Sequence, residues 1–426
     1  MHQQPQAARR NPRTVSVLFS EGSSLSARQA LSALGPLGYR IDVCDPNPLC
    51  LSRFSRFVRR FHRSPALGTD PAAYLHFIVG RLREGRYDVL LPVHEQAFLF
   101  ARTQRRLAPQ VGLAVTAFDQ LALLQSKATF TKVLAHLGLP QPRTRLVRSR
   151  AELEAEAAFP YYVKQPYSTA GRGVWRVGDT AERFAVIAGL QAQGYLDGQT
   201  DIVIQSAASG VQCQAQAVFE HGSLIALHCT SQRAVGMGGS QSARLGVDHP
   251  SVRSHLAELG RHLSWHGAMA VDYFFDPATQ QPLYFEANPR LVEPMNGVLS
   301  GVNLADILVR LSLGESFKEA GIRVGKPGVR SHSLVATLLG LAAANASRTL
   351  IAGEVVRAVV GRGVYSGSRE DLTPLRSDPW SLVPLSVVIV GVLFNPAIAN
   401  RLSAHTVADY SMTPKAVETI SNLEDR

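Results

Sequence analysis

Cysteine is scarce in this chain of 426 residues, which has only Cys44, Cys50, Cys213 and Cys229. None of them forms a Cys-x-x-Cys pair or a cluster with histidine, so the sequence has no pattern of a structural zinc site or of a disulfide framework. Isolated thiols of this kind predict a reducing compartment. The polar stretch Met1–Arg13 has no apolar run, so we expect a flexible N-terminus and no secretory signal.

Signatures of nucleic-acid binding are missing as well. The chain has 44 Lys and Arg residues against 33 Asp and Glu residues, a formal net charge of +11. Such an excess can attract nucleic acid, an acidic membrane surface or phosphorylated ligands. The basic residues are scattered, with no zinc-finger spacing and no aromatic-basic RNA-binding pattern, so we expect no nucleic-acid partner.

Charged residues make up only 18% of the chain, and we find no internal repeat and no low-complexity tract. With 46% hydrophobic residues, the composition is typical of a folded α/β protein. A chain of this length exceeds one simple core, so we divide it into parts. These are a flexible N-terminus (1–13), an α/β domain (14–117), a domain that carries the chemistry (118–315) and a C-terminal extension with apolar segments (316–426).

The N-terminal domain shows short apolar runs on either side of a helix-like stretch, Leu25–Leu37. Strands that alternate with helices favour a parallel sheet with crossover helices. The runs that predict strands are Val15–Phe19, Tyr39–Cys44, Asp88–Val93 and Leu113–Thr116.

A basic and aromatic run occupies Ser52–Arg63. Its apolar residues Phe54, Phe57, Val58 and Phe61 share one face at helical spacing, which predicts a core helix with a solvated basic face. The alternative is a contact with an anionic substrate or with a membrane surface.

No charged residue occurs in Pro379–Asn400, and Leu382–Phe394 is strongly apolar. This length approaches what is needed to cross a bilayer, although Pro384 and Gly391 interrupt it. One interpretation is a buried helix or hairpin that packs on the rest of the protein, and the other is membrane insertion or surface docking. We therefore expect a cytoplasmic protein, with membrane association through residues 379–400 as the alternative.

The first candidate for chemistry is Lys164, at the end of a predicted strand that Pro166 terminates. A loop rich in Gly and hydroxyl groups, Ser168–Gly173, connects it to a second strand, Val174–Val177. Backbone N–H groups of such a loop can close over phosphates, and the lysine adds a point charge. The loop residues expected at the phosphates are Ser168, Thr169, Gly171 and Gly173.

Further candidates lie on both sides of this loop. Upstream, Lys127 lies near the start of a helix that ends at Gly138. Downstream, a predicted hairpin brings Asp272 beside Glu286, and strand alternation places Glu286 and Asn288 on the same side. Three oxygen ligands on adjacent strands suit Mg²⁺, whereas hydrogen-bonded carboxylates at a hairpin edge are the purely structural alternative.

The order of Lys127, Lys164 with its Gly-rich loop, Asp272 and the run Glu286-Ala-Asn-Pro-Arg290 resembles the ATP-grasp superfamily over residues 15–315. The pattern is most similar to the carbamoyl-phosphate-synthase-like and carboxylate–amine ligase branches. In that family two α+β lobes clamp ATP, and an N-terminal α/β domain helps to bind the substrate. The resemblance implies a parallel α/β domain, a two-lobed ATP-grasp domain and a C-terminal, partly apolar helical extension.

The resemblance also implies roles for these residues. Lys127 and Lys164 correspond to the two lysines that contact phosphate. Glu286 and Asn288 correspond to ligands of Mg²⁺ or Mn²⁺, with Asp272 as a further acidic ligand.

An arginine completes this set in the family. Arg290 corresponds to the group that stabilises the transferring phosphoryl group and the acyl phosphate. The Gly-rich stretch between Arg233 and Arg244 resembles the family's substrate-side loop, which makes both arginines candidates for gripping a carboxylate or phosphate. A surface loop with solvated arginines is the alternative.

The stretch Asp201–Gly210 resembles the inter-lobe hinge that contacts adenine through its backbone. Many members carry Glu where this chain has Gln205 and Gln212. A glutamine can still bond adenine or ribose, as donor and acceptor, but the change can alter the choice of nucleotide. The expected nucleotide contacts are Gln205, Ser206, Ala208 and Gln212.

We therefore expect an ATP- and Mg²⁺-dependent ligase that activates a small-molecule carboxylate as an acyl phosphate for attack by an amine. The alternatives are an ATP-dependent carboxylase or carbamoyl-transfer enzyme, and a non-catalytic, membrane-docked nucleotide-binding protein. Substrate contacts in such enzymes come from variable loops. Candidates at strand ends are Glu21, Ser23, Ser24, His94 and Glu95.

Overall fold

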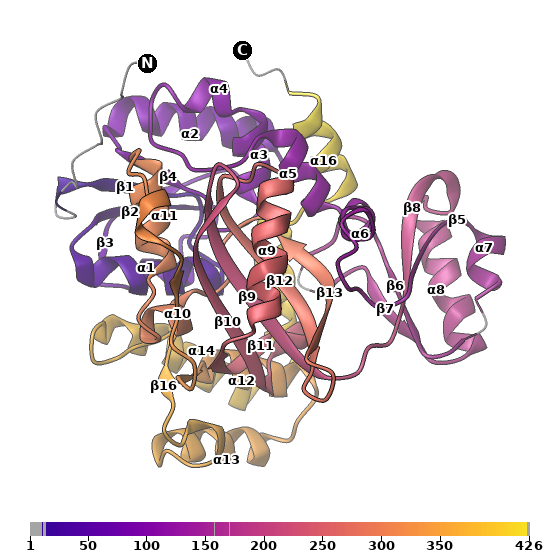
Figure 1. Ribbon diagram of the computed structural model, residues 1–426. Coiled ribbons are helices and arrows are strands. Elements are labelled where there is room, and N and C mark those ends of the chain that lie inside the picture. Colours follow the sequence, from indigo (N-terminus) through magenta and orange to yellow (C-terminus); the bar gives the residue numbers. More distant parts are fainter. Residues whose placement is uncertain (1–10, 12–13, 157, 170, 424–426) are drawn as a thin grey trace.

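The computed structural model describes residues 11, 14–156, 158–169 and 171–423, with backbone alone for 402–406. The predicted flexible segment 1–13 lies outside the described residues except for Asn11. Four parallel strands in the order β3-β2-β1-β4 form the first sheet, drawn in indigo in Figure 1. They are β1 (Ser16–Phe19), β2 (Arg40–Asp45), β3 (Val58–Arg63) and β4 (Val89–Leu91).

Helices flank this sheet because each has one apolar face. In α1 (Leu25–Leu34) the Ser24 hydroxyl accepts the N–H of Ala27, and the helix then buries Leu31 and Leu34. The Asp70 carboxylate caps α2 (Pro71–Gly85) in the same way. The remaining helices here are α3 (Gln96–Arg102) and α4 (Gln104–Leu107).

Two expectations for this domain are wrong. Ser52–Arg63 does not form a core helix but a short 3₁₀ turn, Leu51–Arg53, followed by the edge strand β3. The reason is tertiary, because the guanidinium of Arg59 on β3 pairs with the buried carboxylate of Asp42 on β2. Leu113–Thr116 forms no strand, and only the preceding residue, Gly112, makes an isolated bridge to Val89.

A second four-stranded sheet lies at the right of Figure 1. Its order is β5-β8-β6-β7, with antiparallel neighbours throughout. The strands are β5 (Thr144–Ser149), β6 (Tyr161–Lys164), β7 (Val174–Val177) and β8 (Asp197–Ser206). Helices α7 (Arg150–Glu154) and α8 (Thr180–Ala192) cover one face, and their apolar residues enclose a separate core with Val163 and Ile204. We call this unit the small lobe.

Eight strands form the third sheet, in the order β13-β12-β9-β10-β11-β15-β16, with β14 paired to β10. We call it the large sheet. The strands are β9 (Val211–Glu220), β10 (Ser223–Val235), β11 (Gln241–Val247), β12 (Gly267–Asp276), β13 (Gln281–Asn288), β14 (Arg323–Val324), β15 (Arg330–His332) and β16 (Arg369–Glu370). Strands β14–β16 come from beyond residue 315, so the C-terminal part of the chain completes this sheet.

Helices connect the three sheets. Two short helices, α5 (Phe118–Gln125) and α6 (Lys127–His136), lead from the N-terminal domain to the small lobe. The helices that pack near the large sheet are α9 (Pro250–His262), α10 (Met295–Leu299) and α11 (Leu304–Ser312).

Apart from β14–β16, the C-terminal extension is mainly helical. It contains α12 (Leu334–Ala343), α13 (Arg348–Val359), α14 (Leu382–Phe394), α15 (Ile398–Tyr410) and α16 (Pro414–Ser421). Helix α16 returns to the N-terminal domain and packs on α2 and α3 (Figure 1). Within the described ranges, we find no helix that combines the length and the apolar character required to span a bilayer.

Candidate active site

The two predicted lysines approach the large sheet from the small-lobe side. Lys127 is buried at the first position of α6, and its Nζ lies 2.9 Å from Glu286 Oε1. The same ammonium donates to the backbone oxygen and the hydroxyl of Ser168, at 3.1 and 3.0 Å. Lys164 ends β6 and donates to Gln205 Oε1 at 2.6 Å and to the Phe285 carbonyl at 3.3 Å. Both cations therefore meet β13.

The loop that follows β6 has the backbone conformation that its glycines permit. Gly171 and Gly173 have φ of +74° and +69°, a region that favours glycine. A Cβ on Gly171 would lie 3.1 Å from the carbonyl oxygen of Gly238, in the turn between β10 and β11. The Gly-rich loops of the small lobe and of the large sheet therefore touch each other. The neighbouring Ala170 lies outside the described residues.

Of the four predicted hinge contacts, Gln205 and Ser206 end β8, and Ala208 and Gln212 follow it. Gln205 is buried and bridges two strands, because its carbonyl accepts from Lys164 and its amide donates to the Thr144 hydroxyl at 3.0 Å. Ser206 donates its N–H to the Arg143 carbonyl. Ala208 lies in the connection to β9, and Gln212 lies half-buried near the start of that strand. Gln205 thus places the strand that leads into this hinge directly beside Lys164.

Three oxygen-bearing side chains lie together on the β12–β13 hairpin. Asp272 and Glu286 are direct partners in the antiparallel register. Asp272 accepts from Asn288 Nδ2 at 3.1 Å and from Gln214 Nε2 at 2.9 Å. The two adjacent carboxylates with one amide oxygen form a hard, oxygen-only donor set, which is the type that Mg²⁺ takes.

The charges of this cluster shift each other's proton affinity. Burial, followed by the charge of Glu286, raises the pKa of Asp272 to about 7. Burial also acts to raise the pKa of Glu286, but the two lysines outweigh it and the pKa falls below its ordinary value. Burial lowers the pKa of Lys164 to about 8, against the attraction of Glu286. A divalent cation would relieve the repulsion between the two carboxylates, so the residues present fit a metal ion.

Arg290 joins this cluster to the N-terminal domain. Its Nη2 lies 3.2 Å from Glu95 Oε1 and 3.2 Å from Asn288 Oδ1. Its Nε is buried and has no hydrogen-bond partner. Glu95 also accepts from Gln125 at 2.7 Å and from the Thr169 hydroxyl at 3.5 Å. Glu95 therefore contacts both the predicted catalytic arginine and the phosphate-loop threonine.

Two other arginines lie in different surroundings. Arg244 is buried, and its guanidinium donates to Glu293 at 2.5 Å and to Asp371 at 3.1 Å. Arg233 is half-buried and donates to the Val364 carbonyl at 3.0 Å. Both therefore bind parts of the chain beyond the Lys127–Glu286 cluster.

Of the candidates at the N-terminal strand ends, Glu21 and Ser23 line a separate cavity, together with Asp45 and Tyr410. Glu21 accepts the N–H groups of Ser23 and Ser24, and burial, together with the charge of Asp45, raises its pKa to about 7. The cavity lies at the carboxyl ends of parallel strands, where α/β domains commonly bind ligands.

His94 borders this region. Its ring lies 4.0 Å from the ring of Tyr410, which comes from the end of α15. Burial lowers the pKa of His94 well below its ordinary value, and its Nδ1 has no hydrogen-bond partner. His94 is therefore a neutral ring between Arg290 and the C-terminal extension.

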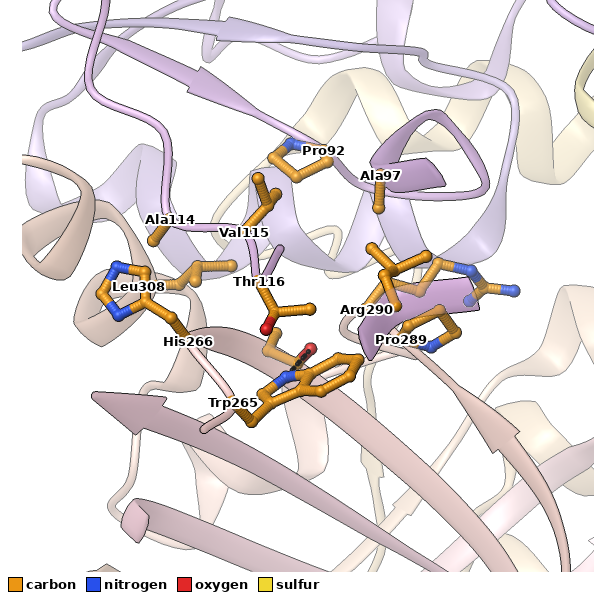
Figure 2. A pocket seen from close by; sticks show the side chains of 12 residues that line it. Pro92, Ala97, Ala114, Val115, Thr116, Trp265, His266, Pro289, Arg290 and Leu308 are labelled. Atoms are coloured by element: carbon orange, nitrogen blue, oxygen red, sulfur yellow. Dashed lines mark hydrogen bonds between the residues drawn. The ribbon is translucent and has the colours of Figure 1, made fainter. Parts of the chain in front are cut away.

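Figure 2 shows another cavity, which is an interior gap rather than part of this cluster. Its walls are largely apolar, and the indole N–H of Trp265 donates to the Ala268 carbonyl at 3.2 Å. Arg290 contributes its stem, while its guanidinium points away from the other labelled side chains.

Sequence reasoning missed one residue that positions the cluster, Gln214. In β9, Gln212, Gln214 and Gln216 alternate with small and apolar residues. Gln214 holds Asp272, and Gln216 accepts the N–H of Val292 just after Arg290. Polar side chains at every second position of a buried strand were the signal that could have revealed them.

The sequence was compared with those of known proteins. No protein-family model matches the sequence. The large chain of carbamoyl phosphate synthase from Thermus thermophilus is 26% identical over 233 residues, which is 50% of this chain and 22% of that protein. The chain thus spans about a fifth of the length of the relatives it matches.

Three solved structures have similar folds. N5-carboxyaminoimidazole synthetase from Staphylococcus aureus complexed with ADP has a TM-score of 0.59 at 14% identity, covering 84% of this chain and 91% of that one. The biotin carboxylase domain of Hydrogenobacter thermophilus 2-oxoglutarate carboxylase, with MgADP and bicarbonate, has a TM-score of 0.58 at 13% identity, covering 74% and 73%. L-amino acid ligase from Bacillus licheniformis has a TM-score of 0.55 at 15% identity, covering 72% of this chain and 76% of that one.

These relatives and neighbours are all ATP-grasp enzymes. The predicted resemblance and the predicted mixed α/β and α+β fold are therefore confirmed.

Proposed function

We propose that this chain, which has the ATP-grasp fold, is an ATP- and Mg²⁺-dependent ligase that activates a small-molecule carboxylate for attack by an amine. The observation that carries the proposal is the contact between Lys127 Nζ and Glu286 Oε1 at 2.9 Å, with Lys164 beside it. It joins the proposed phosphate-binding cations, on α6 and on β6 of the small lobe, to a metal-type donor set on the large sheet. The ATP-grasp neighbours with ADP or MgADP support the nucleotide and the metal.

In this proposal the small lobe holds the nucleotide. Lys127 and Lys164 bind phosphate oxygens together with the loop residues Ser168, Thr169, Gly171 and Gly173. The adenine contacts are Gln205, Ser206, Ala208 and Gln212. Because Lys127 already donates to the Ser168 hydroxyl, the loop and the lysine are held in register before phosphate arrives.

Asp272, Glu286 and Asn288 would hold the metal ion. The ion supplies positive charge that offsets the charge on the phosphate oxygens during transfer. Gln214 orients Asp272 through its amide, so that both carboxylates face the same side of the hairpin. These three side chains therefore set where the phosphates lie relative to the lysines.

Arg290 would act on the reacting groups. Its buried, unpartnered Nε is a donor available to an oxygen of the transferred phosphoryl group, while Glu95 and Asn288 fix its Nη2. The substrate carboxylate attacks the γ-phosphorus, ADP leaves, and the resulting acyl phosphate reacts with the amine to release phosphate. The contact between Gly171 and the Gly238 turn would help to exclude water from this intermediate.

Substrate recognition is proposed for the N-terminal side of the site. Glu21 and Ser23 line the cavity at the sheet edge, and the Ser24 hydroxyl donates to Glu21. Arg233 remains a candidate for a substrate carboxylate. Arg244 would act indirectly, through Glu293, because its own donors are taken by carboxylates.

Trapping with hydroxylamine tests the proposal. The protein is incubated with ATP, Mg²⁺, hydroxylamine and a panel of carboxylic acids, and hydroxamate and ADP are measured. A true acyl phosphate gives hydroxamate and ADP in equal amounts with at least one acid, and Arg290→Ala abolishes both. ADP release without hydroxamate from any acid would refute carboxylate activation of this kind.

A second candidate function is ATP-dependent carboxylation. The observation in its favour is the similarity to a biotin carboxylase domain that holds bicarbonate. ADP release that requires bicarbonate and no added acid or amine would favour this function.

A further inference from the structure

Two motifs that the proposed activity does not use lie close together at one end of the molecule. One is the apolar helix α14 and the residues before it, and the other is the basic edge strand β3. They are more than 300 positions apart in the sequence. Asp378 joins them, because its carboxylate accepts the N–H of Arg56 at 3.1 Å and the guanidinium of buried Arg28 at 2.8 Å. The basic run is therefore bonded, through Arg56, to a residue two positions before Trp380.

Helix α14 turns a large apolar face outward. Pro384, Leu385 and Val392 are buried on one side. On the other side Phe394 is 78% exposed and Trp380, just before the helix, is 61% exposed. The exposed face of α14, which we call the C-terminal apolar face, consists of Trp380, Leu382, Val387, Val390 and Phe394. Val387, Val390 and Phe394 follow the helical repeat and lie on one side of α14, and Trp380 and Leu382 extend the exposed apolar surface to the start of the helix.

Helix α13 adds a second exposed apolar stripe. It packs against α14, and Arg348 at its start donates to the carbonyl of Phe394 at 2.8 Å. Val356, Val359 and Val360 are more than half exposed, on the side of the helix opposite buried Ile351. Helix α13 lies at the periphery of the molecule, at the bottom of Figure 1. Exposed apolar residues in such a concentration indicate a surface that is covered by something else.

The exposed charge in the segment that contains this face is mainly positive. The exposed arginines between residues 345 and 401 are Arg348, Arg357, Arg362, Arg369, Arg376 and Arg401. The acidic residues of the same segment do not match them. Asp371 and Asp378 are fully buried, Glu354 pairs with Arg357, and the Glu370 carboxylate accepts backbone N–H groups. The surface charge in this segment is therefore mainly that of the arginines.

The edge strand extends this positive rim. Arg53, Arg56, Arg60 and Arg63 are exposed, whereas Arg59 is held by Asp42. Arg60 and Arg63 lie on β3, the outermost strand of its sheet, and Arg53 and Arg56 lie just before it. The basic run that was first interpreted as a solvated helix face thus borders the start of α14.

We propose that the C-terminal apolar face, with its arginine rim, docks on the surface of a membrane that contains anionic lipids. Apolar and aromatic side chains with arginines around them match the boundary between acyl chains and acidic headgroups. Helix α14 has 13 residues and a length of roughly 20 Å, which is less than the roughly 30 Å of a hydrocarbon core, so it lies along the surface.

Charge decides between this occupant and a second copy of the chain. A symmetric contact through this face would bring two sets of arginines together without acidic partners, and like charges repel. An anionic bilayer offers opposite charge both to the arginines of the C-terminal segment and to those of the basic run.

Sedimentation of the full chain with vesicles tests the proposal. Vesicles of phosphatidylcholine alone are compared with vesicles that also contain phosphatidylserine, at low and high salt. We expect binding to the anionic vesicles that weakens as salt screens the arginines. The double variant Val387→Asp, Phe394→Asp should lose affinity by about tenfold or more, because two exposed apolar side chains no longer enter the bilayer.

Matched controls separate this face from general stickiness. Phe184→Asp alters an exposed phenylalanine of similar type on α8 of the small lobe and should leave vesicle binding unchanged. Equal binding of the double variant and the parent chain would overturn the proposal, as would equal binding to neutral and anionic vesicles. A concentration-dependent dimer that the double variant abolishes, without vesicle binding by the parent, would assign the face to a second copy instead.

Discussion

Two of the buried groups of charges in the described part of the chain differ in how completely their donors are paired. In the candidate active site, Asp272 and Glu286 repel each other, and Arg290 has a buried donor without a partner. In the second group, Arg244 divides its donors between Glu293 and Asp371. Asp371 also accepts from the Ser331 hydroxyl and from the Gln29 amide.

The difference teaches how to distinguish a site from a structural support. Burial of charge is common to both groups and identifies neither. Repulsion between carboxylates is also common to both groups, because the charge of Asp371 acts, after burial, to raise the pKa of Glu293. An unused buried donor is costly, so the Nε of Arg290 indicates a place where a ligand supplies the missing partner. The second group instead links the N-terminal domain, the large sheet and the C-terminal extension, through Gln29, Arg244 and Asp371.

The largest expected effect is on the first group. Glu286→Gln should lower Mg²⁺-dependent ADP release by about 10²- to 10³-fold, because a metal ligand and its charge are removed. The fold should persist, since a glutamine still accepts a hydrogen bond from Lys127. Rates of ADP release and thermal unfolding of both proteins check this prediction.

Glu84→Gln is the matched control for this change, because it removes an exposed carboxylate that pairs with Arg81 at the surface. It should leave ADP release unchanged. Turnover of Glu286→Gln at the rate of the parent chain would remove the metal assignment.

A substitution in the second group should lower the free energy of unfolding instead of the rate of ADP release. Arg244→Met leaves two buried carboxylates without their cation and should lower the free energy of unfolding by about 3–5 kcal/mol. Urea unfolding curves measure the change. Arg253→Met, which breaks a partly exposed pair with Asp248, should cost about 1 kcal/mol or less. A stable Arg244→Met protein that has lost activity alone would show that Arg244 belongs to the active site.

The smallest effect concerns pH. The pKa of Asp272 is raised to about 7 in the folded protein, so the native state holds this proton more tightly than the unfolded chain. Its ionisation therefore destabilises the metal-free fold as the pH rises from about 4 to about 7. Asp272→Asn should reduce this fall in stability, measured as the slope of unfolding free energy against pH. An unchanged slope would contradict the raised pKa of this carboxyl.

Much of the site could be predicted because the hairpin fixes it locally. Strand alternation and a short turn place Glu286, Asn288 and Asp272 on one face wherever the hairpin packs. Lys164 likewise lies only four residues before the loop Ser168–Gly173, so the two are close wherever β6 packs. Gln214 escaped prediction because its importance depends on which strand lies beside β12, and β9 is more than 50 residues away.

The helix predicted for Ser52–Arg63 from its apolar spacing was wrong, also because a neighbouring strand decides the structure of this segment. Four apolar residues at helical intervals describe one side of a helix, but Asp42 on the neighbouring strand offers Arg59 a buried ion pair that a helix would forgo. Tertiary pairing outweighed local pattern in this segment.

The sequence by itself determined the order of the elements, the ATP-grasp resemblance and the residue types that converge on phosphate and metal. These depend on interactions between residues close in the chain. Only the tertiary structure decided that Glu95 reaches Arg290, that Arg244 is enclosed by Glu293 and Asp371, and that α14 exposes a face beside β3. Contacts between distant segments depend on how separate sheets pack, and no local pattern encodes that packing.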